Sequence, residues 1–452
     1  MPKQVQHNAI RVIKLEIKVR TFVLKMLLGA LSLSPTPAFT QTPSSATVHA
    51  ATPLDARIAQ LPSVLGGQLP YADYFAPSFL AAVPEVQLKG LSDQLIAQFG
   101  KPLKILSVTR VGPSSATVQI EYEKAIATTD ISVEPSAPNK IVGLLVKGFE
   151  TKGDTAAKID ADFATLPGAA GYLVEKIAAD GTRTQIAGRN VTQQFAVGST
   201  FKLYVLAELA AQVDAGRRKW SDVVPLTEIS YSSSATQGWP RDTPVTLQTL
   251  ATWMISVSDN AATDTLMRVL GREAIEKKIA LIGHSNPERA LPLLTTVEAF
   301  ALKTNQELGK AFQTASEVKQ RALLQEKSAD LTYEKINLVA LGSGPVAIDS
   351  IEWFASPMDI AALLNNMRSA ATKPLLDILS VNKGIGPASA AKWAYLGYKG
   401  GSEPGVISMS FLAKSKAGEY YSITGSWNNP AAAVDNAMFA QLMTRLLDSV
   451  AG

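Results

Sequence analysis

Three short tracts, far apart in this chain, combine residue types that could carry out acyl transfer. Ser199-Thr200-Phe201-Lys202 places a hydroxyl and an amine three residues apart, and Ser258-Asp259-Asn260 and Lys399-Gly400-Gly401-Ser402 follow later. A serine hydroxyl is a weak nucleophile at neutral pH and needs a base nearby. Positions i and i+3 of a helix lie on one face, so the Lys202 amine can reach Ser199. In apolar surroundings its pKa falls, and it can then accept the proton.

The second and third tracts supply groups that complement such a nucleophile. Ser258 and Asn260 follow an amphipathic run, so we expect them in a loop at a helix end. There the Ser258 hydroxyl can relay a proton to a leaving group, while the Asn260 amide can hold Lys202 and a substrate carbonyl. Because Gly400 and Gly401 let a strand edge approach a ligand closely, Lys399 can direct its charge toward a substrate carboxylate.

An oxyanion hole can be assembled from two backbone N–H groups. One belongs to the helix N-terminus at Ser199, and the other to Ser402, which follows Gly401. The Ser402 hydroxyl can also bind the substrate carboxylate. We expect Asp259 to cap the helix that begins at Ala261.

None of these tracts is specific alone. S-x-x-K also occurs at Ser316, Ser380 and Ser389, so at least three of the four matches are accidental. Taken alone, the Ser199 tract is explained by a capping serine beside a snorkelling lysine. S-D-N occurs once, 59 residues after Ser199 (258 minus 199), and a lysine before Gly-Gly follows it. The joint occurrence of all three favours catalysis over a capping serine and a glycine-rich turn.

Composition excludes several other chemistries. The chain has 452 residues, 46% apolar and 18% charged, typical of a globular protein with room for two domains. It has no cysteine, which excludes disulfides and thiol catalysis. Of three histidines, His284 alone falls in the expected folded body, so a zinc site of several His or Cys ligands is excluded, and a Ser-His-Asp triad would need His284. We predict no metal and no cofactor.

Residues 1–38 look like an export signal, with a basic stretch, an apolar run at 26–31 and small residues suited to cleavage. The first 25 residues carry six Lys/Arg and one Glu, so removing that +5 from the net +4 leaves −1 and predicts no nucleic-acid surface. The apolar run is shorter than the about 20 residues that span a bilayer. We therefore expect a periplasmic or secreted monomer without a membrane span; the alternative is an uncleaved anchor.

The rest of the chain divides into two expected bodies. Residues 39–60 predict a flexible linker, 61–150 a small α+β domain, 151–170 a second linker and 171–452 the body that carries the tracts. In the first body we expect a helix at 91–99 and strands at 105–110, 116–122 and 140–149. In the second we expect strands at 171–177, 182–186, 406–414 and 420–427 and a final helix at 431–450. Strands at both ends predict one antiparallel sheet with helices on both faces.

With these tracts, residues 171–452 resemble the serine β-lactamase and penicillin-binding protein superfamily, nearest to class A. The run Thr246-Leu247-Gln248-Thr249-Leu250 through Ala262 matches class A in composition and spacing. The leading body and Lys399 through Gly405 are similar to the two-domain serine hydrolase of clavulanic acid biosynthesis and its lipoprotein relatives. The resemblance implies a class A-like α+β fold, preceded at 61–150 by an α+β cone like steroid isomerases and polyketide cyclases.

By position, the resemblance implies Ser199 as nucleophile, Lys202 as base, Ser258 as proton relay, and Lys399 with Ser402 as carboxylate subsite. The chain departs from class A where a glutamate in E-x-x-L-N activates the deacylating water. The nearest match, Glu288-Arg289-Ala290-Leu291-Pro292, ends in proline, so Glu288 is either that base or a surface carboxylate. The 141 residues from Ser258 to Lys399 (399 minus 258) exceed class A and hold an extra helical tract at 304–327, like the clavulanic-pathway relative.

Three functions are compatible with this sequence. The first is a serine hydrolase that forms an acyl-enzyme on Ser199 with a β-lactam or a small ester or amide. The second is a penicillin-binding protein or sensor that deacylates slowly. The third makes the leading domain the functional part, binding a lipid-like or polyketide-like ligand.

Overall fold

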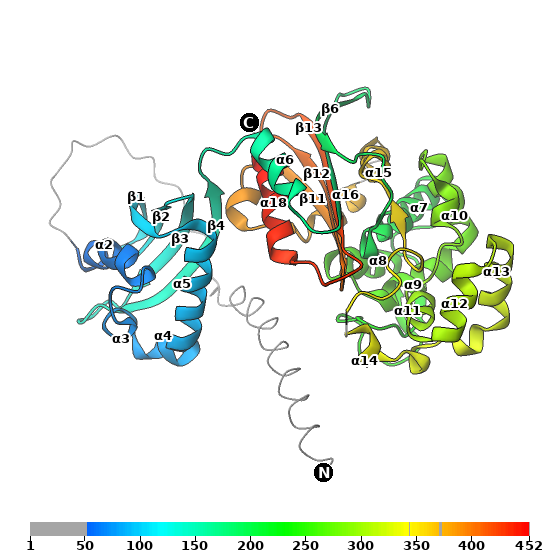
Figure 1. The fold of residues 1–452 in the computed structure, drawn as a ribbon, viewed down its shortest axis with the longest axis horizontal. Helices are drawn as coiled ribbons and strands as arrows, with labels where there is room; N and C mark the ends of the chain where they lie inside the picture. The colour runs from blue at the N-terminus through cyan, green and yellow to red at the C-terminus, as the bar shows by residue number, and fades with distance from the viewer. Residues whose placement is uncertain (1–51, 343, 370–372, 452) are drawn as a thin grey trace, which may run out of the picture. The chain divides into compact units, whose positions relative to one another are not determined.

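The computed structural model describes residues 52–342, 344–369 and 373–451 (Figure 1). The described residues form two compact units, which divide between Phe149 and Glu150. The expected export signal lies outside the described residues, as does the expected linker up to residue 51. Within the described part of the chain, no helix has both the length and the apolar character needed to cross a bilayer.

In the first unit, a four-stranded sheet packs against helices (Figure 1). The order is β1-β2-β3-β4, and β2 pairs antiparallel with both β1 and β3. Buried residues alternate along β2 and β3, so one face of the sheet meets the core. The elements are α2 (Pro53–Leu65), α3 (Tyr71–Tyr74), α4 (Pro77–Ala82), α5 (Glu85–Phe99), β1 (Pro102–Gly112), β2 (Ser115–Tyr122), β3 (Ala125–Val133) and β4 (Ile141–Thr151).

The prediction of a linker at 39–60 is wrong from Pro53 onward, because this stretch begins helix α2. Thr52 and Asp55 form a capping box, and Pro53 occupies the first helical position. Leu54, Ile58 and Leu61 are buried and recur at helical spacing. The abundance of Thr, Pro and Ala hid this apolar face.

The second unit is built on a five-stranded sheet in the order β11-β12-β13-β5-β6, antiparallel throughout. Its strands are β5 (Ala169–Ile177), β6 (Arg183–Arg189), β11 (Tyr395–Glu403), β12 (Val406–Lys414) and β13 (Tyr420–Asn428). Two-stranded pairs are formed by β7 (Phe195–Ala196) with β10 (Phe354–Ala355) and by β8 (Val223–Leu226) with β9 (Thr243–Thr246). The predicted assembly of one sheet from both ends of this body is confirmed.

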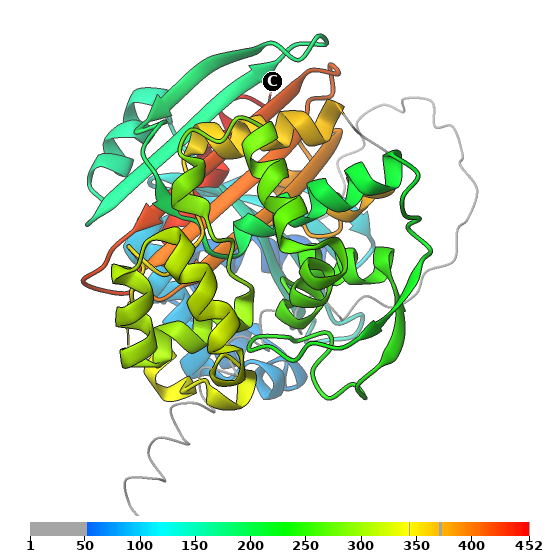
Figure 2. The same cartoon turned by 90° about the vertical axis from the view of Figure 1, so that its right-hand side faces the viewer.

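Helices cover both faces of this sheet (Figures 1 and 2). On one face lie α6 (Ala156–Ala164) and α18 (Asn436–Asp448). The other face meets the larger core and its helices. These and the remaining helices are α7 (Lys202–Asp214), α8 (Leu247–Ser256), α9 (Asn260–Leu270), α10 (Arg272–Leu281), α11 (Thr296–Thr304), α12 (Gln306–Thr314), α13 (Glu317–Glu326), α14 (Leu338–Leu341), α15 (Pro357–Ser369), α16 (Lys373–Ser380) and α17 (Pro387–Ala390).

The prediction of a second linker at 151–170 is also wrong, since α6 and the start of β5 occupy it. Ile159 and Phe163 of α6 are buried in the core beneath α18. The polar residues that suggested a linker have a specific partner, because Arg445 of α18 pairs with Asp154 and Asp162. From sequence alone, a polar stretch that pairs with a partly buried cation cannot be distinguished from a solvated linker.

The turn that carries Ser199 is clamped between two segments. It is the 3₁₀ turn η1 (Gly198–Phe201), which leads directly into α7. On one side the Val197 N–H donates to the Trp353 carbonyl at 2.9 Å. On the other side lies β11, where a Cβ on Gly401 would stand 2.4 Å from the Ser199 nitrogen. This contact therefore requires glycine at position 401.

We predict that Gly401→Ala lowers the free energy of unfolding by about 2 kcal/mol, because the added methyl meets backbone atoms of η1 that have no room to yield. Chemical denaturation measures the change. The matched control is Gly90→Ala in α5, where a Cβ would meet nothing within 4 Å, and a gain of up to about 1 kcal/mol is expected. Equal effects of the two substitutions would mean that η1 and β11 can separate enough to admit a side chain.

Candidate active site

The amine of Lys202 lies at the centre of the cluster formed by the three tracts. Lys202 is fully buried at the first turn of α7. Its Nζ donates to the Asn260 Oδ1 at 2.5 Å and to the Ser258 carbonyl at 2.7 Å, and lies 3.1 Å from the Ser258 hydroxyl. Burial lowers the pKa of Lys202 to about 7, although Asp264 and Asp259 oppose the shift. The amine is thus partly neutral at physiological pH.

The hydroxyl of Ser258 joins the second and third tracts. It accepts a hydrogen bond from the Lys399 Nζ at 3.0 Å while also facing Lys202, so two amines share one oxygen. Burial, together with the nearby charge of Lys202, lowers the pKa of Lys399 well below its usual value. Ser258 adopts a φ of 59°, a left-handed conformation that is uncommon outside glycine. Such strained residues persist where the surroundings hold them, often at functional sites.

Ser199 and Ser402 lie beside this cluster, where η1 meets β11. Ser199 is half-buried and Ser402 exposed, so both are accessible from solvent. A Cβ on Gly198 would lie 3.3 Å from the Ser402 nitrogen, so the backbones of η1 and β11 approach closely at this point. The structure brings together the side chains of Lys202, Ser258, Asn260 and Lys399. It also brings the backbone around Ser199 close to Gly401 and Ser402.

Asp259 does more than the predicted helix capping. Its carboxylate accepts from the Ala262 N–H as the cap of α9 and also from the backbone N–H groups of Ala235 and Thr236, at 2.9 to 3.0 Å. The neighbouring Asn260 donates to the Tyr231 carbonyl at 2.6 Å. The loop before β9 is thereby tied to the S-D-N tract. The Thr236 hydroxyl also donates to Asp259, at 2.9 Å. The sequence held no signal for this role, because Ala235 and Thr236 lie 24 and 23 residues away along the chain.

Glu288 and His284 are not drawn into this cluster. Glu288 is exposed on a 3₁₀ turn (Pro287–Ala290), beside a hollow of about 390 Å³ whose lining includes none of the tract residues. The His284 ring accepts from the Asn286 N–H at Nδ1, so its Nε2 carries the hydrogen and donates to the Phe354 carbonyl at 3.0 Å. Both ring nitrogens therefore bind main chain, which leaves none for a catalytic triad.

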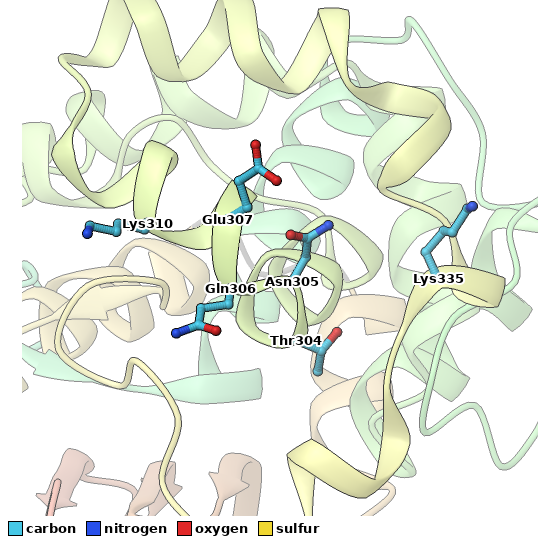
Figure 3. Close-up of a pocket in the computed structure, with 6 residues that line it drawn as sticks. All are labelled: Thr304, Asn305, Gln306, Glu307, Lys310 and Lys335. Carbon is cyan, nitrogen blue, oxygen red and sulfur yellow. The ribbon is translucent and has the colours of Figure 1, made fainter.

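A second, more open hollow of about 560 Å³ lies at the start of α12 and is lined entirely by polar residues (Figure 3). Its side chains point in different directions, with Lys310 and Lys335 on opposite sides (Figure 3). A ligand site needs polar groups that point toward a common centre, and the side chains of this hollow do not. The lining contains none of the tract residues.

The sequence model of the β-lactamase enzyme family matches residues 154–336. The matched stretch contains the first two tracts, begins just before α6, and ends ahead of the third tract. The match supports a relationship of this stretch to the serine β-lactamase superfamily. No curated protein matches the chain.

Solved structures similar to this chain include two β-lactamases and PBP-A. The β-lactamase from Sphaerobacter thermophilus DSM 20745 is 20% identical, with 65% of this chain and 94% of that chain covered and a TM-score of 0.44. The β-lactamase from Chitinophaga pinensis DSM 2588 is 17% identical, with 66% of this chain and 98% of that chain covered and a TM-score of 0.46. PBP-A is 16% identical, with 66% of this chain and 94% of that chain covered and a TM-score of 0.44.

We predict that Asp259→Ala lowers the free energy of unfolding by about 3 kcal/mol, because several buried N–H groups lose their acceptor at once. Thermal or chemical denaturation measures the loss. The matched control is Asp435→Ala, which removes an exposed helix cap that accepts from Ala437 and Met438 and should cost about 1 kcal/mol. A loss at Asp259 no larger than at Asp435 would reduce its role to capping.

Proposed function

We propose that this protein is an active-site serine hydrolase of the β-lactamase type, which forms an acyl-enzyme on Ser199 with a β-lactam or a small ester or amide. The observation that carries the proposal is the shared Ser258 hydroxyl, which Lys202 and Lys399 both contact within 3.1 Å. Residues separated by 141 positions meet there, beside the turn of Ser199. Neither helix capping nor surface solvation of the lysines accounts for burying two amines together.

In the proposed acylation, the neutral amine of Lys202 takes the proton of Ser199 as Oγ bonds to the substrate carbonyl carbon. The N–H groups of Ser199 and Ser402 stabilise the oxyanion that forms. The bond from carbon to the leaving nitrogen or oxygen then breaks. The proton held by Lys202 passes through the Ser258 hydroxyl to that leaving atom, which completes the step.

The state of Lys399 favours an anionic substrate. Burial without a counter-charge destabilises its ammonium form. A substrate carboxylate bound near Lys399 and the Ser402 hydroxyl would supply that counter-charge and restore the proton. Asn260, whose amide oxygen holds Lys202, can turn its remaining N–H toward a substrate carbonyl.

Deacylation divides the two candidate functions. Water must attack the acyl carbon while a base takes its proton, and Ser199 Oγ must leave with a proton. Among the residues that the structure describes, no carboxylate forms a hydrogen bond with Lys202 or Ser258, and Glu288 lies exposed on its turn. This observation favours the second candidate, a penicillin-binding protein with a long-lived acyl-enzyme.

From residues 1–38 we also propose export, with the first unit as an accessory domain.

We predict that benzylpenicillin adds its full mass to the wild-type protein, because opening the lactam ring loses no atom. Intact-mass spectrometry after mixing measures the adduct, and a time course then separates the two candidates. Rapid return to the native mass indicates a hydrolase, whereas an adduct that lasts for hours indicates the slowly deacylating protein.

Two serine variants identify the nucleophile in this measurement. Ser199→Ala should form no adduct, since the attacking oxygen is gone. Ser316→Ala, in an S-x-x-K tract away from the site, should react like the wild type. Absence of a wild-type adduct with benzylpenicillin, with a chromogenic cephalosporin and with a p-nitrophenyl ester would refute the proposal.

We predict that acylation accelerates about tenfold from pH 6 to pH 8, because a base with a pKa of about 7 changes from mostly protonated to mostly neutral over this range. Burst kinetics with p-nitrophenyl acetate measure the rate. This ester has no carboxylate, so protonation of Lys399 does not enter through substrate binding. A rate that is flat or falls over this range would exclude Lys202 as the base.

A further inference from the structure

A third buried lysine, besides Lys202 and Lys399, lies close to the proposed site. The Lys303 side chain, at the end of α11, is 1% exposed. Its Nζ contacts the Glu352 Oε1 at 2.5 Å and also the carboxylate of Glu403. The Glu352 side chain is fully buried and that of Glu403 is 14% exposed. The proposed acylation uses none of these groups.

Glu352 belongs to the segment that holds the serine turn from one side. Its neighbour Trp353 accepts the Val197 N–H at the carbonyl, and the indole stacks on Phe201 with ring centroids 4.2 Å apart. The indole N–H donates to the Leu294 carbonyl at 2.9 Å. A shift of Glu352 would therefore displace Trp353, against which η1 packs.

Glu403 belongs to the strand that holds the serine turn from the other side. It follows Ser402 on β11 and shares a face with Lys399 and Gly401, because side chains alternate along a strand. Gly401 is the residue that abuts the Ser199 nitrogen. Glu352 and Glu403 thus mark the two segments between which η1 is clamped, and Lys303 bridges them.

The other end of α11 is fastened to the S-D-N helix. Thr296 donates to the Asp264 carboxylate through its N–H and its hydroxyl, both at 2.7 Å, and the Val297 N–H adds a third bond at 3.0 Å. Asp264 lies in α9, which begins at Asn260. Helix α11 therefore connects the second tract to both segments that surround the first.

We infer that Lys303 is a positioning residue, which braces strand β11 against the serine turn and so holds the Ser402 N–H where the oxyanion of an acylation step would form. The inference rests on the proposed function for its catalytic consequence, but the brace itself follows from the contacts of Lys303 and α11. A buried lysine between two carboxylates is costly to assemble. Its presence beside the third tract is explained if it fixes the segments of Glu352 and Glu403 relative to η1.

The charges of the cluster agree with a brace rather than a solvated ion pair. Burial lowers the pKa of Lys303, but Glu352 and Glu403 outweigh this and raise it overall, so the ammonium is retained. Burial raises the pKa of Glu403 well above its usual value, and the charge of Glu352 adds to the rise. Removing the lysine leaves two adjacent buried carboxyl groups with no cation between them, and these separate or take up protons.

The test compares Lys303→Met with Arg445→Met. Arg445 is also a cation held by two carboxylates, Asp154 and Asp162, but on the opposite face of the sheet. We expect Lys303→Met to reduce the limiting acylation rate with benzylpenicillin about tenfold or more, because a small misplacement of an oxyanion donor is sufficient. The concentration for half-maximal rate should change little. Arg445→Met should stay within about twofold of wild type even if its melting temperature falls equally.

Hydrogen exchange gives a second readout that needs no activity. In Lys303→Met we expect faster exchange in peptides covering 198–203 and 399–405, and in Arg445→Met no change there.

If Lys303→Met folds poorly, Glu403→Gln provides a second variant, because it keeps the side-chain shape but weakens the bridge. We expect it to show the same changes in acylation and exchange, but smaller. If the wild type forms no adduct, the proposed function fails and exchange alone decides the brace. Unchanged exchange at 399–405, or acylation of Lys303→Met at the wild-type rate, would overturn the inference.

Discussion

The site depends on keeping the amine of Lys202 away from water while giving it three oxygen contacts. An ammonium group in such a place loses its hydration, and the Ser258 and Asn260 oxygens replace it incompletely. The pKa of Lys202 falls to about 7 as a result. This one constraint explains why the surroundings are so tightly fixed. A mobile neighbour would admit water and return the lysine to its ordinary charged state.

Much of the second unit can be understood as the means of fixing those surroundings. Asp259 holds the loop that contributes the Tyr231 carbonyl, and Asp264 holds α11. The closeness of η1 to β11, which allows no side chain at Gly401, sets the distance between the proposed oxyanion donors. Each contact requires a buried polar group or a glycine, which are costly choices in a protein core.

The segment between the S-D-N tract and the third tract differs most from the pattern that the sequence resembles. It carries α11 to α13, and within the described ranges no carboxylate hydrogen bonds to Lys202 or Ser258. The same segment carries Lys303. An enzyme that acylates readily and deacylates slowly needs an accurate oxyanion hole but no poised water. The close approach of η1 and β11 beside Ser199 suits the first requirement.

The sequence alone determined the tracts and most elements near them. The sequence predicts strand β12 with its observed bounds, because alternating and β-branched residues specify it. It also predicts Asp259 as a helix cap, because this residue directly precedes the helix. The linkers at 39–60 and 151–170 were misjudged, because polar or Pro-rich composition conceals a helix whose partners are distant, as Arg445 is for Asp162. Only the tertiary structure could decide that two amines share the Ser258 hydroxyl and that Lys303 bridges Glu352 and Glu403. Such contacts join residues 49 to 141 positions apart, and local periodicity carries no information at that range.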